Sequence, residues 1–113
     1  MANFYKSETF DLTTTNLTTV LTINTSSVAL VKSMPITNEH NNKVLTECYI
    51  RDASAGTDYE FFHAEVTADS TTVAVPGVLN LEAGDSIKIQ VDVANTVKGV
   101  ISYALIDRSQ ENG

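Results

Sequence analysis

A chain of 113 residues, 42% of them hydrophobic and 19% charged, lies in the ordinary globular range and is long enough for one domain. Its 14 acidic residues outnumber its 7 basic ones, and the net charge of −7 repels nucleic-acid phosphates and anionic lipid headgroups. We therefore expect a single core, no nucleic-acid partner and no membrane partner.

The N-terminal segment carries three aromatic residues, Phe4, Tyr5 and Phe10, ahead of a more regular strand pattern. Residues 1–15 are therefore predicted to be either a first edge strand or an arm that docks on a neighbour, and residues 16–113 to be the sandwich domain. The segment has no apolar signal core, and no run approaches the roughly 20 apolar residues that span a bilayer. We expect a chain that is assembled in a cytoplasm and is not secreted by a signal peptide.

Apolar alternation predicts strands along the rest of the chain. In residues 28–36, strict alternation gives one mostly buried face, composed of Val28, Leu30, Met34 and Ile36 and shared with Lys32. The opposite face then holds Ala29, Val31 and Ser33. Because Pro35 cannot donate to a ladder, this strand should be at an edge or bulged there.

Residues 44–51 and 59–66 alternate in the same way, and they contain the residues that could support chemistry. A Cys/His hydrolase would need the only cysteine, Cys48, beside His40 or His63, but a thiol in apolar surroundings is a poor thiolate. A metal site would need Glu60 near His63, whereas strict alternation points these two side chains to opposite faces. Only Glu65 then shares a face with His63, which favours an ordinary polar pair.

The stretch LNLEAGDSIKIQV, residues 79–91, places EAGD between two alternating apolar runs. Gly84 is the natural residue for a positive φ in such a hairpin, and Asp85 can bond to nearby backbone amides. We predict that these two residues form a structural turn rather than an acidic site. The last run, residues 100–107, is apolar on both faces and is predicted to be central in its sheet.

About seven or eight short strands with regular turn signals predict an all-β fold, a single antiparallel β-sandwich of jelly-roll or Ig-like type. The sequence contains no phosphate-binding loop, dinucleotide fingerprint, nucleophile elbow or zinc-ligand spacing. We therefore predict no enzyme, with no catalytic residue, no cofactor and no metal.

Three stretches, VKSMPITN (residues 31–38), LNLEAGDSIKIQV and VISYALID (residues 100–107), resemble the small β-sandwich structural proteins in virions of tailed bacteriophages, notably cyanophages. The similarity covers residues 28–107. The chain departs from that family in reading VPG where the family often has VPAG, and in its Met-Pro within a strand. The resemblance implies a non-enzymatic building block of the virion, present in many copies.

Within the virion, the resemblance implies a capsid decoration or cement protein first, and a neck or tail accessory or fibre-attachment subunit as the alternative. The implied partners are the major capsid protein, then neck or tail proteins, and further copies in a homo-oligomer. We predict Phe4, Tyr5 and Phe10 as partner-binding residues, because aromatic residues near a terminus make good interface anchors. An alternative of another class is a carbohydrate-binding host-adhesion module, against which the absence of Trp counts.

Overall fold

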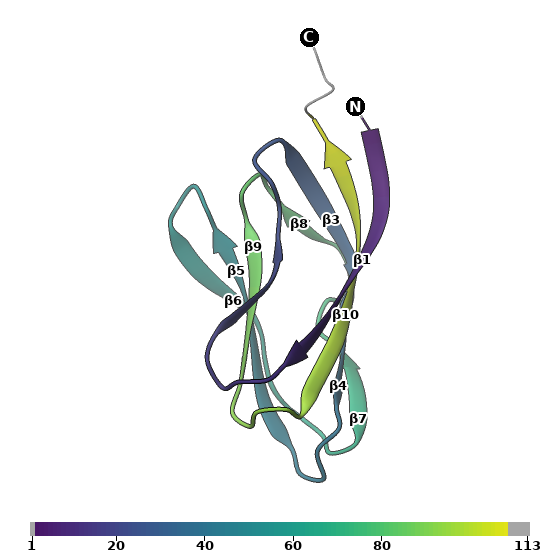
Figure 1. Ribbon diagram of the computed structural model, residues 1–113, viewed down its shortest axis with the longest axis vertical. Helices are drawn as coiled ribbons and strands as arrows, with labels where there is room; N and C mark the ends of the chain where they lie inside the picture. The colour runs from purple at the N-terminus through teal and green to yellow at the C-terminus, as the bar shows by residue number, and fades with distance from the viewer. Residues whose placement is uncertain (1, 109–113) are drawn as a thin grey trace.

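The computed structural model describes residues 2–108, which form two antiparallel sheets and no helix (Figure 1). The predicted all-β antiparallel sandwich is confirmed, although the described residues form ten strands rather than the seven or eight expected. Its strands are β1 (Ala2–Leu12), β2 (Thr18–Thr22), β3 (Ser27–Ser33), β4 (Pro35–Asn38), β5 (Val44–Asp52), β6 (Thr57–Val66), β7 (Ser70–Val73), β8 (Leu79–Leu81), β9 (Ser86–Val91) and β10 (Val97–Asp107). Residue 1 of the predicted N-terminal segment and residues 109–113 of the predicted sandwich domain lie outside the described residues. Within residues 2–108, no helix is long and apolar enough to cross a membrane.

The strands pair in a nested order around the β5–β6 hairpin. In the smaller sheet the order is β2-β9-β5-β6. In the larger sheet β10 pairs with β1 on one side and with β3 and β4, end to end, on the other. Strands β8 and β7 then pair with β3 and β4. Pairing of β1 with β10, β2 with β9, and β3 and β4 with β8 and β7 is the connectivity of a jelly roll.

The core fills the space between the two sheets. Its alternation is clearest in β9, where Ile87, Ile89 and Val91 are buried and the residues between them are partly exposed. The largest fully buried side chains are Leu12, Val31, Ile23, Met34, Ile36, Asn38, Val44, Leu81, Ile87, Ile89, Val97 and Ile101. They come from both sheets, so one core holds the two layers together.

The prediction of a single buried face along residues 28–36 is wrong. Ala29 and Val31 are buried in β3, and Met34 and Ile36 are buried after it. The pairing with β10 shifts register between Val31 and Ser33, which leaves Lys32 as an extra residue in the strand. An extra residue exchanges the two faces of a strand, because side chains alternate with a period of two. The chain then leaves strand geometry for one residue immediately before Pro35.

Candidate functional site

Strand β1 is an exposed edge strand of the larger sheet. It pairs with β10 along its full length without a register shift. Residues 3–9 are all exposed, and Phe4 and Tyr5 keep 47% and 81% of their surface accessible. The Nζ atom of Lys32 lies 5.8 Å from the centroid of the Tyr5 ring, which is within the range of a cation–π interaction. Two of the three predicted partner-binding aromatics therefore lie on an open edge of the sandwich.

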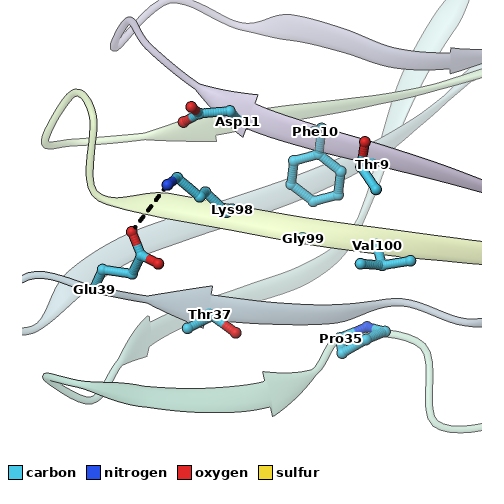
Figure 2. A pocket seen from close by; sticks show the side chains of 9 residues that line it. All are labelled: Thr9, Phe10, Asp11, Pro35, Thr37, Glu39, Lys98, Gly99 and Val100. Carbon is cyan, nitrogen blue, oxygen red and sulfur yellow. Dashed lines mark ion pairs between the residues drawn. The ribbon is translucent and has the colours of Figure 1, made fainter.

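Phe10, the third aromatic residue, is half-buried and packs against the core. Its ring lies against Gly99 of β10, so closely that a Cβ at residue 99 would overlap it. Figure 2 shows the ring between β1 and β10. Phe10 lines an open hollow of about 600 Å³ there. An ion pair of 3.3 Å between Glu39 and Lys98 crosses one side of this hollow. Phe10 thus fastens β1 to the sandwich, and we expect removal of the N-terminal segment to disturb folding.

Three titratable side chains meet on the outer face of the smaller sheet. The Nδ1 atom of His63 lies 3.1 Å from a carboxylate oxygen of Glu60 and 3.3 Å from one of Glu47. The expectation that Glu60 points away from His63 is wrong, because β6 shifts register against β5 between Phe62 and Glu60. Phe61 is the extra residue of this bulge, and it brings Glu60 to the face of His63.

The two carboxylates raise the pKa of His63, with Glu60 as the larger cause, and His63 in turn lowers the pKa of Glu60. The candidate ligand atoms of the three residues lie within 4.8 Å of one another, and imidazole and carboxylate are groups that bind Zn²⁺. Protonated His63, however, already supplies a cation to both carboxylates. The arrangement by itself is an ion-pair cluster on an exposed face.

The cluster makes stability depend on pH. Folding raises the pKa of His63, so protonated His63 stabilises the folded state. This stabilisation is fully present below about pH 6.5, the ordinary pKa of histidine, and is lost as the pH rises through the raised pKa. We expect His63→Gln to lower the Tm by about 1–3 °C more at pH 6 than at pH 8.5. Thermal unfolding at both values, with His40→Gln as the control outside the cluster, checks this. A His63→Gln loss of the same size at both values would contradict it.

The loop between β8 and β9 is held by its own backbone and by Asp85, which is buried. The Asp85 carboxylate accepts a hydrogen bond from the Ala53 N–H at 3.1 Å and another from the Glu82 N–H at 2.9 Å. Gly84 has a φ of 85°, and its N–H donates to the Ile23 carbonyl at 3.0 Å. Hydrogen bonds therefore connect this acidic loop to Ile23 and to Ala53, at one end of the sandwich.

Cys48 lies in the core with no exposed surface. Burial, with a smaller effect from the charge of Glu60, raises the pKa of its thiol to about 12. The thiol is therefore protonated at neutral pH, and it faces the core whereas His63 lies on the outer face of the same sheet. A Cys/His nucleophile pair is not assembled from these two residues.

No family model matches the chain, and no curated protein matches it. Solved structures do share its fold. A chain of the acid-stable capsid of Helicobacter pylori bacteriophage KHP30 matches with a TM-score of 0.60 and 13% identity, over 96% of this chain and 90% of that one. A chain of the T13 particle of infectious bursal disease virus matches with a TM-score of 0.57 and 9% identity, over 94% of this chain.

The chain spans only 31% of the length of that infectious bursal disease virus chain. A subunit of Bacillus endospore appendages, described as disulfide-linked pili, matches with a TM-score of 0.55 and 11% identity, over 94% of this chain and 88% of that one. At such low identities these similarities show a common fold and nothing more specific.

Proposed function

We propose that the chain is a non-enzymatic structural subunit of a bacteriophage virion. The observation that carries this proposal is the similarity to the KHP30 capsid chain, which extends over nearly the full length of both chains. The infectious bursal disease virus particle and the endospore appendages are also assemblies of many subunits. These three matches therefore come from a phage capsid, a viral particle and a pilus. An exposed edge strand such as β1 suits a subunit that must contact neighbours.

Within the virion, we assign the chain to the head surface, as a decoration or cement protein bound to the major capsid protein. The KHP30 match supports this position because it comes from a capsid and is a chain of similar length. The net charge of −7 also suits a subunit on the outside, since it keeps the free subunit from binding DNA. A neck or tail position is the alternative that the experiment below distinguishes.

Linkage by disulfides, the feature named for the endospore appendages, does not suit this chain. A continuous disulfide-linked series needs at least two cysteines in each subunit, and Cys48 is the only one in the sequence. Its thiol is also buried. We propose instead that this chain assembles through noncovalent contacts, with Phe4 and Tyr5 as the exposed anchors and Phe10 holding their strand in place.

The test is reconstitution on phage particles that lack this protein. The purified chain is added to bare heads and to complete particles, which are then separated on a gradient and imaged by electron cryo-microscopy. We expect regular density on the head lattice. Density confined to the neck or tail would move the assignment there, whereas binding to glycans without binding to particles would favour host adhesion and overturn the proposal.

Tyr5→Ser tests the proposed anchor. We expect it to lower the occupancy on particles by about tenfold at a limiting protein concentration, because a truncated interface aromatic commonly costs more than 1 kcal/mol. Tyr59→Ser is the matched control, since Tyr59 is 56% exposed on a different edge strand, β6. Equal losses of occupancy from the two variants would contradict the role of Tyr5.

A further inference from the structure

Among the described residues, the sheets end at edges that differ in how well they are protected. Strand β2 is only five residues long and has a register shift against β9. Strands β7 and β8 have four and three residues, and the chain between them contains Pro76. Strand β6 is bulged and carries the ionisable residues Asp58, Glu60, His63 and Glu65. Short strands, bulges and charges are the features that prevent pairing between molecules.

Strand β1 also carries charged residues, but it is the longest of these edge strands and pairs regularly with its neighbour. It has 11 residues, contains no proline, pairs with β10 without a bulge, and is exposed from residue 3 to residue 9. In an antiparallel ladder, every second residue of an edge strand directs its N–H and C=O away from its neighbour. This strand therefore presents a regular row of backbone donors and acceptors to another strand.

We propose that β1 pairs antiparallel with β1 of a second copy of this chain, about a two-fold axis at Ser7. The larger sheets of the two copies then become one continuous sheet. Two antiparallel neighbours in one sheet can be related only by an axis normal to that sheet, so equivalent faces of the two copies stay on the same side. Ser7 is the middle residue of β1 (Ala2–Leu12), and this centre alone lets all 11 residues overlap.

The charges of β1 favour the same centre. With Ser7 on the axis, Lys6 lies opposite Glu8 of the partner subunit, and Glu8 lies opposite the partner's Lys6. Opposite charges at facing positions stabilise an antiparallel pair, and like charges destabilise it. A centre at residue 6 would place Lys6 against itself, and a centre at residue 8 would place Glu8 against itself. The register with the longest overlap is therefore also the one with matched charges.

The exposed aromatics also gain partners in this register. Phe4 comes to lie opposite Phe10 of the partner subunit, and Tyr5 opposite the partner's Thr9. Aromatic pairs at facing positions contribute to pairing between strands. Because Phe10 is fixed against Gly99, each copy offers the other a positioned ring rather than a mobile one. The pairing thus places each exposed aromatic side chain beside a residue of the partner subunit, while the faces of the joined sheet stay open to other neighbours.

This inference concerns the purified chain alone and does not rest on the proposed virion role. The test measures the mass of the full chain by sedimentation over a range of concentrations, with any purification tag placed after the last residue. We expect a monomer–dimer equilibrium. Lys6→Glu and Glu8→Lys should each raise the dimer Kd by about tenfold or more, because each change puts like charges together at two facing positions.

Mixing the two single variants supplies the decisive control. In a dimer of one Lys6→Glu chain with one Glu8→Lys chain, every facing pair at these positions is attractive again. We therefore expect the mixture to dimerise about as tightly as the unmodified chain, while each variant alone remains mostly monomeric. Both positions are exposed, and circular dichroism checks that each variant is folded.

A cysteine introduced on the axis tests the register. Ser7→Cys should form a disulfide-linked dimer on mild oxidation, because the two copies of residue 7 face each other. Asn3→Cys is the matched control, since its two copies would lie eight residues apart along the paired strands, about 27 Å. Cys48 is buried and should add no background.

A chain that stays monomeric up to millimolar concentration would overturn the proposal. So would open polymers, a dimer whose Kd is unchanged by either charge reversal, or a mixture of the two variants that remains monomeric. Cross-linking of Asn3→Cys in preference to Ser7→Cys would overturn the register.

Discussion

Asp85→Ala is expected to lower the free energy of unfolding by about 2–3 kcal/mol. Asp85 is 6% exposed, and its carboxylate accepts hydrogen bonds from the backbone N–H groups of Ala53 and Glu82. Alanine would leave both donors without this acceptor and would release the β5–β6 turn from the β8–β9 turn. Equilibrium unfolding in urea measures the loss, provided that the m-values of variant and parent agree.

Two further substitutions in this loop separate the role of Asp85 from a general effect of acidic charge. Glu82→Gln removes a negative charge from an exposed position of the same turn, and we expect a change below about 0.5 kcal/mol. The loss of stability in Asp85→Asn should lie between those of Glu82→Gln and Asp85→Ala. An amide keeps one acceptor oxygen but presents an NH₂ group to the second donor. Equal losses in Glu82→Gln and Asp85→Ala would contradict the structural role of Asp85.

The fold class could be predicted because its signals are local. The alternation of Ile87, Ile89 and Val91 is visible in the sequence, and all three residues are buried. Gly84 and Asp85 mark a turn in the sequence, and here φ of Gly84 is 85° and the Asp85 carboxylate accepts two backbone hydrogen bonds. The contact from Ala53 to Asp85 spans 32 residues, however, and no local pattern contains it.

The bulges at Lys32 and Phe61 could not be predicted from the sequence. A bulge is fixed by how a strand pairs with its neighbour, and neither Lys32 nor Phe61 has a local sequence signal that marks it as an extra residue. Strict alternation therefore assigned the wrong face to part of residues 28–36. It also separated Glu60 from His63, so the cluster with Glu47 was missed. One unrecognised residue reverses every face that follows it.

The N-terminal segment shows a similar limit. Its aromatic residues were visible in the sequence, but the choice between an arm and an edge strand depends on pairing with β10, whose residues lie 85 to 105 positions farther along the chain. The opposite charges of Lys6 and Glu8 were also visible. They become informative only when both ends of β1 are known, because those ends place Ser7 at the centre of the strand.

Gly99→Ala is expected to destabilise the protein by about 2 kcal/mol and to loosen β1. A Cβ at residue 99 would overlap the Phe10 ring and lie 2.9 Å from the Pro35 carbonyl oxygen. The ring can move only by leaving its contact with the core, whereas the carbonyl belongs to β4 and is held by the sheet. Unfolding in urea gives the energy, and hydrogen exchange of the β1 amides reports whether that strand is affected first.

A double-mutant cycle with Phe10→Ala identifies the source of the strain. Without the ring, Gly99→Ala should cost about 1 kcal/mol or less, because only the approach to the Pro35 carbonyl oxygen remains. Val100→Ala, at the exposed next residue of β10, is the control for a side-chain change elsewhere on this strand. If Gly99→Ala cost the same with and without the Phe10 ring, the strain would lie at Pro35, and Phe10 would not be the residue that fastens β1 to the sandwich.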